Sequence, residues 1–305
     1  MKRIGILTSG GDCGGLNAAV RSIFYRAKEK YNLDVYGILG GTIGLMERPP
    51  AYVKLDYNTF SGQLIRQGGT FLGTTNKGNP FKYPMGDGTF KDRTVEIIGG
   101  YHELGLDGLI VIGGDGSMKI LKDIADKGKL NIVAIPKTID NDVGATENSI
   151  GFHTAVNVAT NALDNLQFTA ASHSRTMILE VMGRDAGHIA LNAGVGAGAE
   201  EILIPEENLG LERLLESLKR SKASGKSSSI VVVAEGDKTG KNVFELKEYV
   251  ETHLPIYDCR VSVLGHMQRG GSPSCFDRVL ASRMGVKAVE ALMEGKTSLM
   301  VGIQD

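Results

Sequence analysis

The chain lacks the features of a disulfide-stabilised, zinc-binding, nucleic-acid-binding or membrane-spanning protein. Its 305 residues include only three cysteines, Cys13, Cys259 and Cys275, an odd number with no CxxC spacing, which favours free thiols over a disulfide framework or a thiolate zinc site. No apolar run approaches the roughly 18 residues that a membrane span needs. The formal net charge is −1, with lysine and arginine spread along the chain, which argues against a nucleic-acid surface. We expect a soluble, cytoplasmic protein whose partners are small molecules.

Short apolar runs that end in glycine or polar residues alternate with longer amphipathic segments, which is the pattern of an α/β fold. The length and the 42% hydrophobic content suggest two domains. The clearest predicted helix covers 16–30, a mobile loop is expected at 76–92, and a domain crossover is expected within 141–151. The predicted strands are 4–8, 34–39, 109–112, 132–135, 176–181, 201–204, 230–234, 260–264 and 299–303.

The segment PKTIDND at 136–142 directly follows the apolar run 132–135. In open parallel sheets ligands bind beyond the carboxyl ends of strands, so this segment is a candidate chemical site. Asp140 and Asp142 are two residues apart and would point to one side of an extended chain. One carboxylate can accept the proton of an alcohol that attacks phosphorus, while Thr138 and Lys137 bind the phosphoryl oxygens. The alternative, an Asx-rich turn, explains Asn141 and one aspartate but not the whole segment.

Two glycine-rich loops also follow predicted strands: Thr8-Ser9-Gly10-Gly11-Asp12 and Gly113-Gly114-Asp115-Gly116-Ser117. Such loops let backbone N–H groups approach a phosphate at a helix N-terminus, although a tight strand-to-helix turn also favours glycine. Asp115 would repel a polyphosphate unless a cation lay between them, which suggests an Mg²⁺ ligand acting through water. The alternative is that Asp115 is the N-cap of the following helix.

The second half of the chain carries basic residues at predicted strand boundaries: Arg175, Arg184, His266 and Arg269. Arginine side chains suit a terminal phosphate monoester, and Glu235 suits sugar hydroxyls. Any single surface arginine is more often a solvated charge, but four basic residues at strand boundaries favour a binding site.

The motifs TSGGD, FLGTT, GGDGS, PKTIDND, MGR and GHMQRGGSP, in this order and spacing, resemble the 6-phosphofructokinase family over the whole chain. The resemblance implies two similar three-layer αβα domains with mainly parallel sheets and the active site in the cleft between them. Residues 1–150 with 265–305 would bind the donor and magnesium, and 151–264 would bind the sugar phosphate, with a C-terminal segment beyond 305 lacking. It implies phosphoryl transfer from ATP to the 1-hydroxyl of fructose 6-phosphate in glycolysis.

The resemblance also implies roles for individual residues. Asp140 matches the general base, with Thr138, Asp142 and Arg184 as its catalytic neighbours, and Asp115 matches a magnesium ligand. Arg175 and Arg260 match residues that reach a neighbouring subunit's site, which implies a homo-oligomer, a tetramer or dimer. The sugar-phosphate set is Met182, Gly183, Arg184, Glu235, His266, Arg269, Arg175 and Arg260, and the donor set is Gly11, Gly114, Asp115, Gly116, Ser117, Asn76, Lys77 and Lys137.

Several positions depart from the bacterial ATP-dependent pattern. Asn76 and Lys77 stand where an arginine would contact the transferred phosphate, and Lys137 is typical of pyrophosphate-dependent members and of some ATP-dependent ones. Gly116 favours ATP, because pyrophosphate users usually carry an aspartate there, which would oppose the α-phosphate. The resemblance implies an allosteric enzyme. Tyr25 and Gln167 stand where the bacterial effector site would have arginines, so the resemblance does not imply regulation by ADP or phosphoenolpyruvate.

Three alternatives stay open at the level of sequence. The first is a pyrophosphate-dependent fructose 6-phosphate 1-phosphotransferase. The second is an NAD- or lipid-kinase-like enzyme, which would not need the pocket of Arg184, His266 and Arg269. The third is a silent sugar-phosphate sensor, which would lose Asp140 or Asp115, and both are present.

Overall fold

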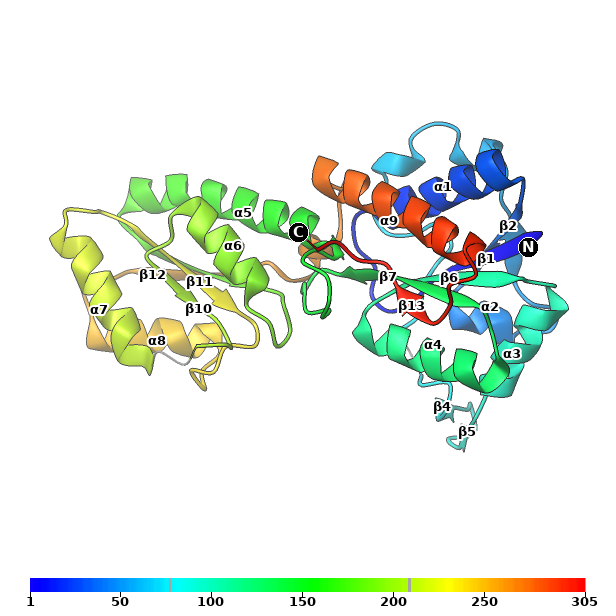
Figure 1. Ribbon diagram of the computed structural model, residues 1–305. Coiled ribbons are helices and arrows are strands. Elements are labelled where there is room, and N and C mark those ends of the chain that lie inside the picture. Colours follow the sequence, from blue (N-terminus) through cyan, green and yellow to red (C-terminus); the bar gives the residue numbers. More distant parts are fainter. Residues whose placement is uncertain (77, 208–209, 305) are drawn as a thin grey trace. The chain divides into compact units, whose positions relative to one another are not determined.

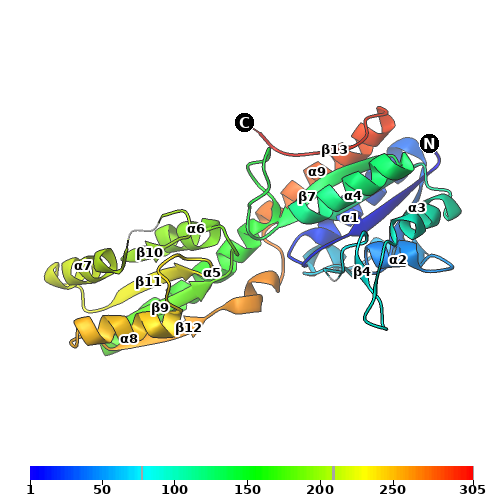
Figure 2. The ribbon, with the colours of Figure 1, turned by 90° about the horizontal axis from the view of Figure 1, so that it is seen from below.

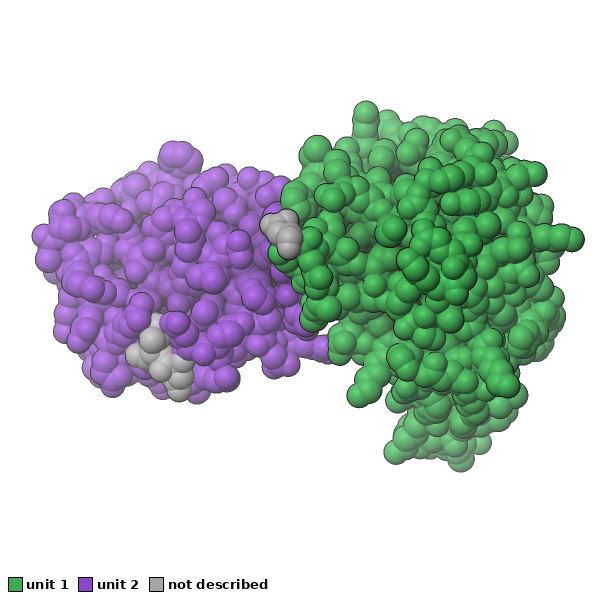
Figure 3. All heavy atoms as spheres, viewed as in Figure 1, with its two compact units in different colours: residues 1–138, 143–151, 271–305 green, residues 139–142, 152–270 purple. Residues whose placement is uncertain are grey.

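The computed structural model describes residues 1–76, 78–207 and 210–304, and the chain folds into two compact units (Figures 1 and 3). Unit 1 comprises residues 1–138, 143–151 and 271–305, and unit 2 comprises residues 139–142 and 152–270. Among the described residues no helix is both long and apolar enough to cross a membrane.

Unit 1 contains a seven-stranded sheet in the order β13-β7-β6-β1-β2-β3, with β8 paired to β7. All neighbours are parallel except β2 and β3. The strands are β1 (Arg3–Thr8), β2 (Asp34–Ile38), β3 (Tyr52–Lys54), β6 (Gly108–Gly113), β7 (Ile132–Thr138), β8 (Ile150–Gly151) and β13 (Leu299–Met300). A separate hairpin is formed by β4 (Tyr83–Pro84) and β5 (Phe90–Lys91).

Helices cover both faces of this sheet, which makes unit 1 a three-layer structure (Figures 1 and 2). On one face lie α1 (Leu16–Tyr25) and α9 (Cys275–Met293), and on the other lie α2 (Thr42–Met46), α3 (Thr94–Glu103) and α4 (Asp115–Gly128). Apolar residues recur on α4 at Leu121, Ile124 and Ala125, and they pack with Leu109 and Val111 of β6 in one buried cluster. This three- to four-residue spacing is why the segment forms an amphipathic helix against the sheet.

Unit 2 has a four-stranded parallel sheet in the order β10-β11-β9-β12. The strands are β9 (Thr176–Val181), β10 (Glu201–Leu203), β11 (Ser229–Ala234) and β12 (Cys259–Val263), with α5 (Phe152–His173) and α6 (His188–Ala197) on one face and α7 (Gly210–Ala223) and α8 (Val243–His253) on the other (Figure 1). Val231 and Val233 pack with Leu218 and Leu246 in the core. A capping box fixes the start of α8. The side chain of Asn242 accepts the backbone N–H of Glu245, and the side chain of Glu245 accepts the backbone N–H of Asn242.

The predicted α/β class with mainly parallel sheets is confirmed, and each predicted strand has its counterpart. Three details of the prediction are wrong. The helix predicted for 16–30 is α-helical only to Tyr25 and continues as a π-helical turn, Arg26–Lys30. The segment 76–92 is not only loop, because it contains the hairpin of β4 and β5. Strand β7 runs on to Thr138, so Lys137 lies within the strand and is buried.

Candidate active site

Three of the predicted site segments begin at the carboxyl ends of neighbouring parallel strands of unit 1. In the sheet, Thr8 at the end of β1 pairs with Ile112 of β6, and Gly113 of β6 pairs with Pro136 of β7. The carboxyl ends of these strands therefore lie at one edge of the sheet, where ligands bind in open parallel sheets. The glycine loops and the start of the PKTIDND segment converge there, as the sequence predicted.

The loop after β1 is held by side chains and backbone from distant segments. Ser9 donates its backbone N–H to the carbonyl of Ile112 at 2.9 Å, and its hydroxyl donates to Oγ of Ser117 at 3.0 Å. Gly10 donates its N–H to the carbonyl of Thr75 at 2.9 Å, while Thr74 Oγ1 donates to the carbonyl of Gly10 at 2.7 Å. The TSGGD, FLGTT and GGDGS motifs thus form one hydrogen-bonded cluster of loops.

Lys137 connects this cluster to β7. Its side chain is only 3% exposed, and its Nζ atom donates to the carbonyl of Gly11. A buried ammonium group requires such partners, because an uncompensated charge in the interior is costly. Lys137 therefore places a positive charge directly under the glycine loop that was predicted to hold donor phosphates.

Helix α4 begins immediately after the second glycine loop. Its N-cap is Gly114, and Asp115 is the first helical residue, so the alternative interpretation of Asp115 as the N-cap is wrong. Asp115 and Gly116 are both exposed. The carbonyl of Gly114 accepts the N–H of Met118 at 3.0 Å, which leaves the N–H groups of the first turn directed away from the helix, where they and the helix dipole favour an anion.

Asp115 suits a magnesium ion that binds together with substrate phosphates, rather than a structural ion enclosed by protein ligands alone. Within the described ranges no group of three His, Cys, Asp or Glu side chains is arranged to hold a metal ion. Mg²⁺ keeps several waters and binds through one or two carboxylates together with phosphate oxygens. A single exposed carboxylate at the start of α4 matches that requirement.

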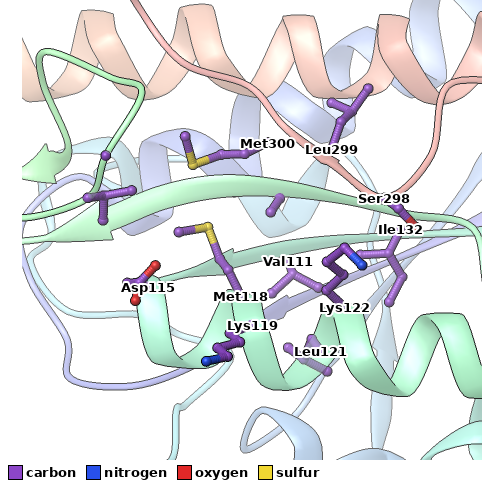
Figure 4. Close-up of a pocket in the computed structure, with 13 residues that line it drawn as sticks. Val111, Asp115, Met118, Lys119, Leu121, Lys122, Ile132, Ser298, Leu299 and Met300 are labelled. Carbon is purple, nitrogen blue, oxygen red and sulfur yellow. The ribbon is translucent and has the colours of Figure 1, made fainter.

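A pocket of about 350 Å³ lies along the flank of α4 that faces β13 (Figure 4). Its lining is mainly apolar, and its charged groups come from α4. Apolar surface cannot replace the hydrogen bonds that a phosphate makes to water, so the glycine loops rather than this pocket are the candidate phosphate site. The labelled lining residues are Val111, Asp115, Met118, Lys119, Leu121, Lys122, Ile132, Ser298, Leu299 and Met300.

The segment after β7 carries the predicted acid–base residues. Thr138 ends the strand, and its carbonyl accepts the hydroxyl of Ser149 at 2.8 Å. Asp140 is half-buried, and Asp142 is exposed. Asn141 between them has φ +53°, a left-handed conformation that asparagine tolerates better than most residues. The chain turns at Asn141, so the segment that carries Asp140 and Asp142 is not extended there.

In unit 2 the predicted sugar-phosphate residues follow three neighbouring strands. Met182, Gly183 and Arg184 come after β9, Glu235 comes after β11, and His266 and Arg269 lie in a short 3₁₀ helix, Gly265–Arg269, after β12. Since β9 lies between β11 and β12, these loops meet at the carboxyl edge of one sheet, which Figure 2 shows with the three strands side by side.

Two residues without a predicted role lie near this edge of the sheet, and one of them, Gln268, joins two of the loops. Gln268 is 1% exposed; its amide nitrogen donates to the carbonyl of Gly265 at 3.0 Å, and its amide oxygen accepts the N–H of Met182 at 3.2 Å. Glu180 of β9 is half-buried, and burial, followed by the charges of Glu235 and Asp237, raises its pKa. Neither role is visible in the sequence, because both depend on which strands are neighbours.

Arg175 and Arg260 lie at the opposite, amino edge of the same sheet. Arg175 precedes β9, and Arg260 is the second residue of β12. Both donate to the carboxylate of Asp258, Arg175 through Nε at 2.7 Å. Six extended residues of β9 separate Arg175 from Met182, roughly 20 Å along a strand. Unit 2 therefore does not bring Arg175 and Arg260 together with Arg184.

Two predicted donor residues lie after the FLGTT motif. Asn76 is exposed and directly follows Thr75, whose carbonyl accepts the N–H of Gly10. Asn76 is therefore adjacent to the loop after β1. Lys77 lies outside the described residues.

Comparisons with known proteins identify the family of the chain. The family model for phosphofructokinase matches residues 3–292. The chain is 54% identical to ATP-dependent 6-phosphofructokinase 1 of Synechocystis sp. over 99% of the chain and 88% of that protein, and 50% identical to ATP-dependent 6-phosphofructokinase 1 of Nostoc sp. over 100% and 89%. The crystal structure of Pichia pastoris phosphofructokinase in the T-state is similar with a TM-score of 0.88 and 32% identity, over 99% of this chain and 34% of that chain. The chain belongs to the phosphofructokinase family.

Proposed function

We propose that this chain transfers the terminal phosphoryl group of ATP to the 1-hydroxyl of fructose 6-phosphate, a step of glycolysis. The observation that carries the proposal is that the TSGGD, GGDGS and PKTIDND segments begin at the carboxyl ends of three neighbouring parallel strands, β1, β6 and β7. The names of relatives at 50–54% identity support the same reaction.

In the proposed reaction, the 1-hydroxyl oxygen attacks the γ-phosphorus, and the bond from that phosphorus to the β,γ-bridging oxygen breaks as ADP leaves. Asp140 accepts the hydroxyl proton as the new bond forms. Thr138 and Asp142 flank this carboxylate in the sequence, Thr138 as a hydroxyl donor to a phosphoryl oxygen.

The donor would bind to the loop cluster of unit 1. Gly11, Gly114 and Ser117 offer backbone or hydroxyl donors to phosphate oxygens, and Lys137 contributes its buried positive charge beneath Gly11. Asn76 stands next to this cluster in the sequence. Asp115 would hold Mg²⁺, which neutralises phosphate charge when bound. Gly116 is exposed and leaves room for an α-phosphate.

The sugar phosphate would bind at the carboxyl edge of the sheet in unit 2. Arg184 and Arg269 suit the 6-phosphate through guanidinium forks, and His266 adds a further donor. Met182 and Gly183 shape the loop after β9, and Glu235 lies in the adjacent loop after β11.

We further propose that the active protein is a homo-oligomer, a tetramer or dimer. Arg175 and Arg260 sit at the amino edge of the sheet, roughly 20 Å from Arg184, so they cannot bind the phosphate that Arg184 of the same chain binds. A second copy would supply them. The three free cysteines suit a reducing compartment, and we place the protein in the cytoplasm.

An assay with fructose 6-phosphate and Mg²⁺, in which fructose 1,6-bisphosphate formation is followed with ATP and separately with pyrophosphate, tests the proposal. We expect turnover with ATP and little with pyrophosphate. Omitting fructose 6-phosphate is the control for simple hydrolysis. Turnover only with pyrophosphate would support the pyrophosphate-dependent alternative, and turnover with neither donor would overturn the proposed reaction.

A further inference from the structure

Arg184 has a backbone conformation that its residue type disfavours. Its φ is +56°, in the left-handed region, where the Cβ atom of a residue other than glycine is crowded. Such conformations persist only where the surrounding structure over-determines them, and they cluster at functional sites. The segment after β9 must therefore be held by groups outside itself.

Glu235 of the neighbouring loop holds it. One carboxylate oxygen, Oε1, accepts the N–H of Arg184 at 2.7 Å and the N–H of Gly183 at 3.2 Å. The backbone N–H of Glu235 donates to the carbonyl of Val181 at 2.9 Å. Glu235 thus forms hydrogen bonds with both ends of the turn from Val181 to Arg184, through its backbone N–H at one end and through its side chain at the other.

Gly236 supplies the space that this turn needs. A Cβ atom at position 236 would lie 1.9 Å from the carbonyl oxygen of Arg184, 3.0 Å from its carbonyl carbon and 3.4 Å from Cα of Asp185. The φ of Gly236 is not left-handed, so glycine is required here for close approach rather than for backbone freedom. The contact is between two backbones, and neither can move aside as a side chain would.

We propose that Glu235 and Gly236 are positioning residues, which set the backbone of Arg184 and thereby the direction of its guanidinium group. Glu235 would then act on the sugar phosphate through Arg184, with Oε1 committed to two backbone N–H groups. This inference rests on the proposed function, because it assumes that Arg184 binds the substrate.

The test compares single and double variants. We expect Gly236→Ala and Glu235→Leu each to raise KM for fructose 6-phosphate by at least ~10-fold, with KM for ATP within ~2-fold. Glu235→Gln keeps one acceptor oxygen and should have a smaller effect than Glu235→Leu. Gly196→Ala in α6 is the matched control: its φ is not left-handed, and among the described residues no atom lies within 4 Å of the added Cβ.

The decisive comparison repeats Gly236→Ala and Glu235→Leu in an Arg184→Ala background. If both residues act through Arg184, neither adds more than ~2- to 3-fold to the KM of Arg184→Ala. Effects that multiply in the double variants would overturn the inference, as would a Gly236→Ala variant with the parent KM. A parent without turnover of fructose 6-phosphate would instead refute the proposed function, so the two failures are distinguishable. If Gly236→Ala does not fold, the comparison of Glu235→Leu, Arg184→Ala and their double variant tests the inference by itself.

Discussion

Arg175 donates a hydrogen bond from Nε to Oδ2 of Asp258 at 2.7 Å, and Arg260 contacts the other oxygen of the same carboxylate. One aspartate thus orients two guanidinium groups that would repel each other without it. The hydrogen bond from Arg175 is the main reason why the pKa of Asp258 is lowered. The pair lies at the amino edge of the sheet in unit 2, where a second copy of the chain would use it under the proposed function.

Asp258→Asn should weaken the hydrogen bonds that orient the guanidinium groups of Arg175 and Arg260. We expect KM for fructose 6-phosphate to rise several-fold with a smaller change in kcat, because positioning of a binding group is lost and Asp140 is untouched. A lowered carboxyl pKa stabilises the folded state above the unfolded pKa, and the contribution is lost as pH falls through the folded value. The urea midpoint of the parent should therefore exceed that of the variant at pH 7, and the gap should shrink below about pH 4. A difference in urea midpoint that persists at low pH would show that the ionised carboxylate of Asp258 is not its source.

Glu180→Gln should stabilise the fold at neutral pH. Burial, followed by repulsion from Glu235 and Asp237, raises the pKa of Glu180, so the folded state loses stability as the pH rises above the ordinary glutamate pKa, and the loss is complete once the pH exceeds the raised value. The glutamine removes that charge at nearly constant shape. We expect a gain in the free energy of unfolding of about 1 kcal/mol or less, because the group is only partly buried. The gain should vanish as pH falls towards the ordinary glutamate range near 4; a gain independent of pH would mean another cause.

The three cysteines should differ sharply in reactivity. Cys13 and Cys259 are buried, and Cys275 is exposed. Burial, with the nearby charges of Glu251 and Asp258, raises the pKa of Cys259 to about 12, so at pH 8 only roughly 10⁻⁴ of it is the reactive thiolate. An aromatic disulfide reagent should modify one thiol per native chain and three in urea. Cys275→Ser should remove the fast reaction, and two fast thiols in the parent would contradict the burial of the others.

The sequence predicts the strands well because each central strand is a short apolar run ended by glycine or a polar cluster, as at Ile132–Thr138 and Ser229–Ala234. It also predicts that the site residues follow strand ends. It does not reveal β3, whose three residues pair antiparallel at the sheet edge and carry no apolar run. The contact between Ser9 and Ser117 joins residues 108 positions apart, and the approach of Gly236 to Arg184 depends on the pairing of β9 with β11. Such contacts follow from strand order and register, which local patterns do not encode.

Asp140→Asn should fold and still bind fructose 6-phosphate, because the amide keeps the shape of the carboxylate while it removes the proton acceptor. Turnover should fall by about 10²- to 10⁴-fold, the range for loss of a general base. The measurement is kcat with saturating ATP, accompanied by calorimetric titration with the sugar phosphate. Asp164→Asn on the exposed side of α5 makes the same change of charge and should retain the parent kcat. A kcat within a few-fold of the parent for Asp140→Asn would assign the proton to another group.

Gly116→Asp tests donor choice, and the structure makes it a clean test. Gly116 is exposed at the second position of α4, its φ is not left-handed, and among the described residues no atom lies within 4 Å of an added Cβ. An aspartate in the first turn of a helix is also favoured by the helix dipole. The substitution should therefore fold, and any loss of activity should come from the ligand.

With ATP, the new carboxylate would crowd and repel the α-phosphate. An unfavourable charge interaction of about 3 kcal/mol corresponds to roughly a hundredfold in rate, so we expect kcat/KM for ATP to fall about 100-fold. Pyrophosphate has no α-phosphate to oppose, and Lys137 already lies beneath the glycine loop, so activity with pyrophosphate should be spared or should appear. Gly86→Asp, in the exposed loop between β4 and β5, controls for the added charge. Equal losses with both donors would mean that Gly116 serves the geometry of the loop and that preference for ATP is set by another residue.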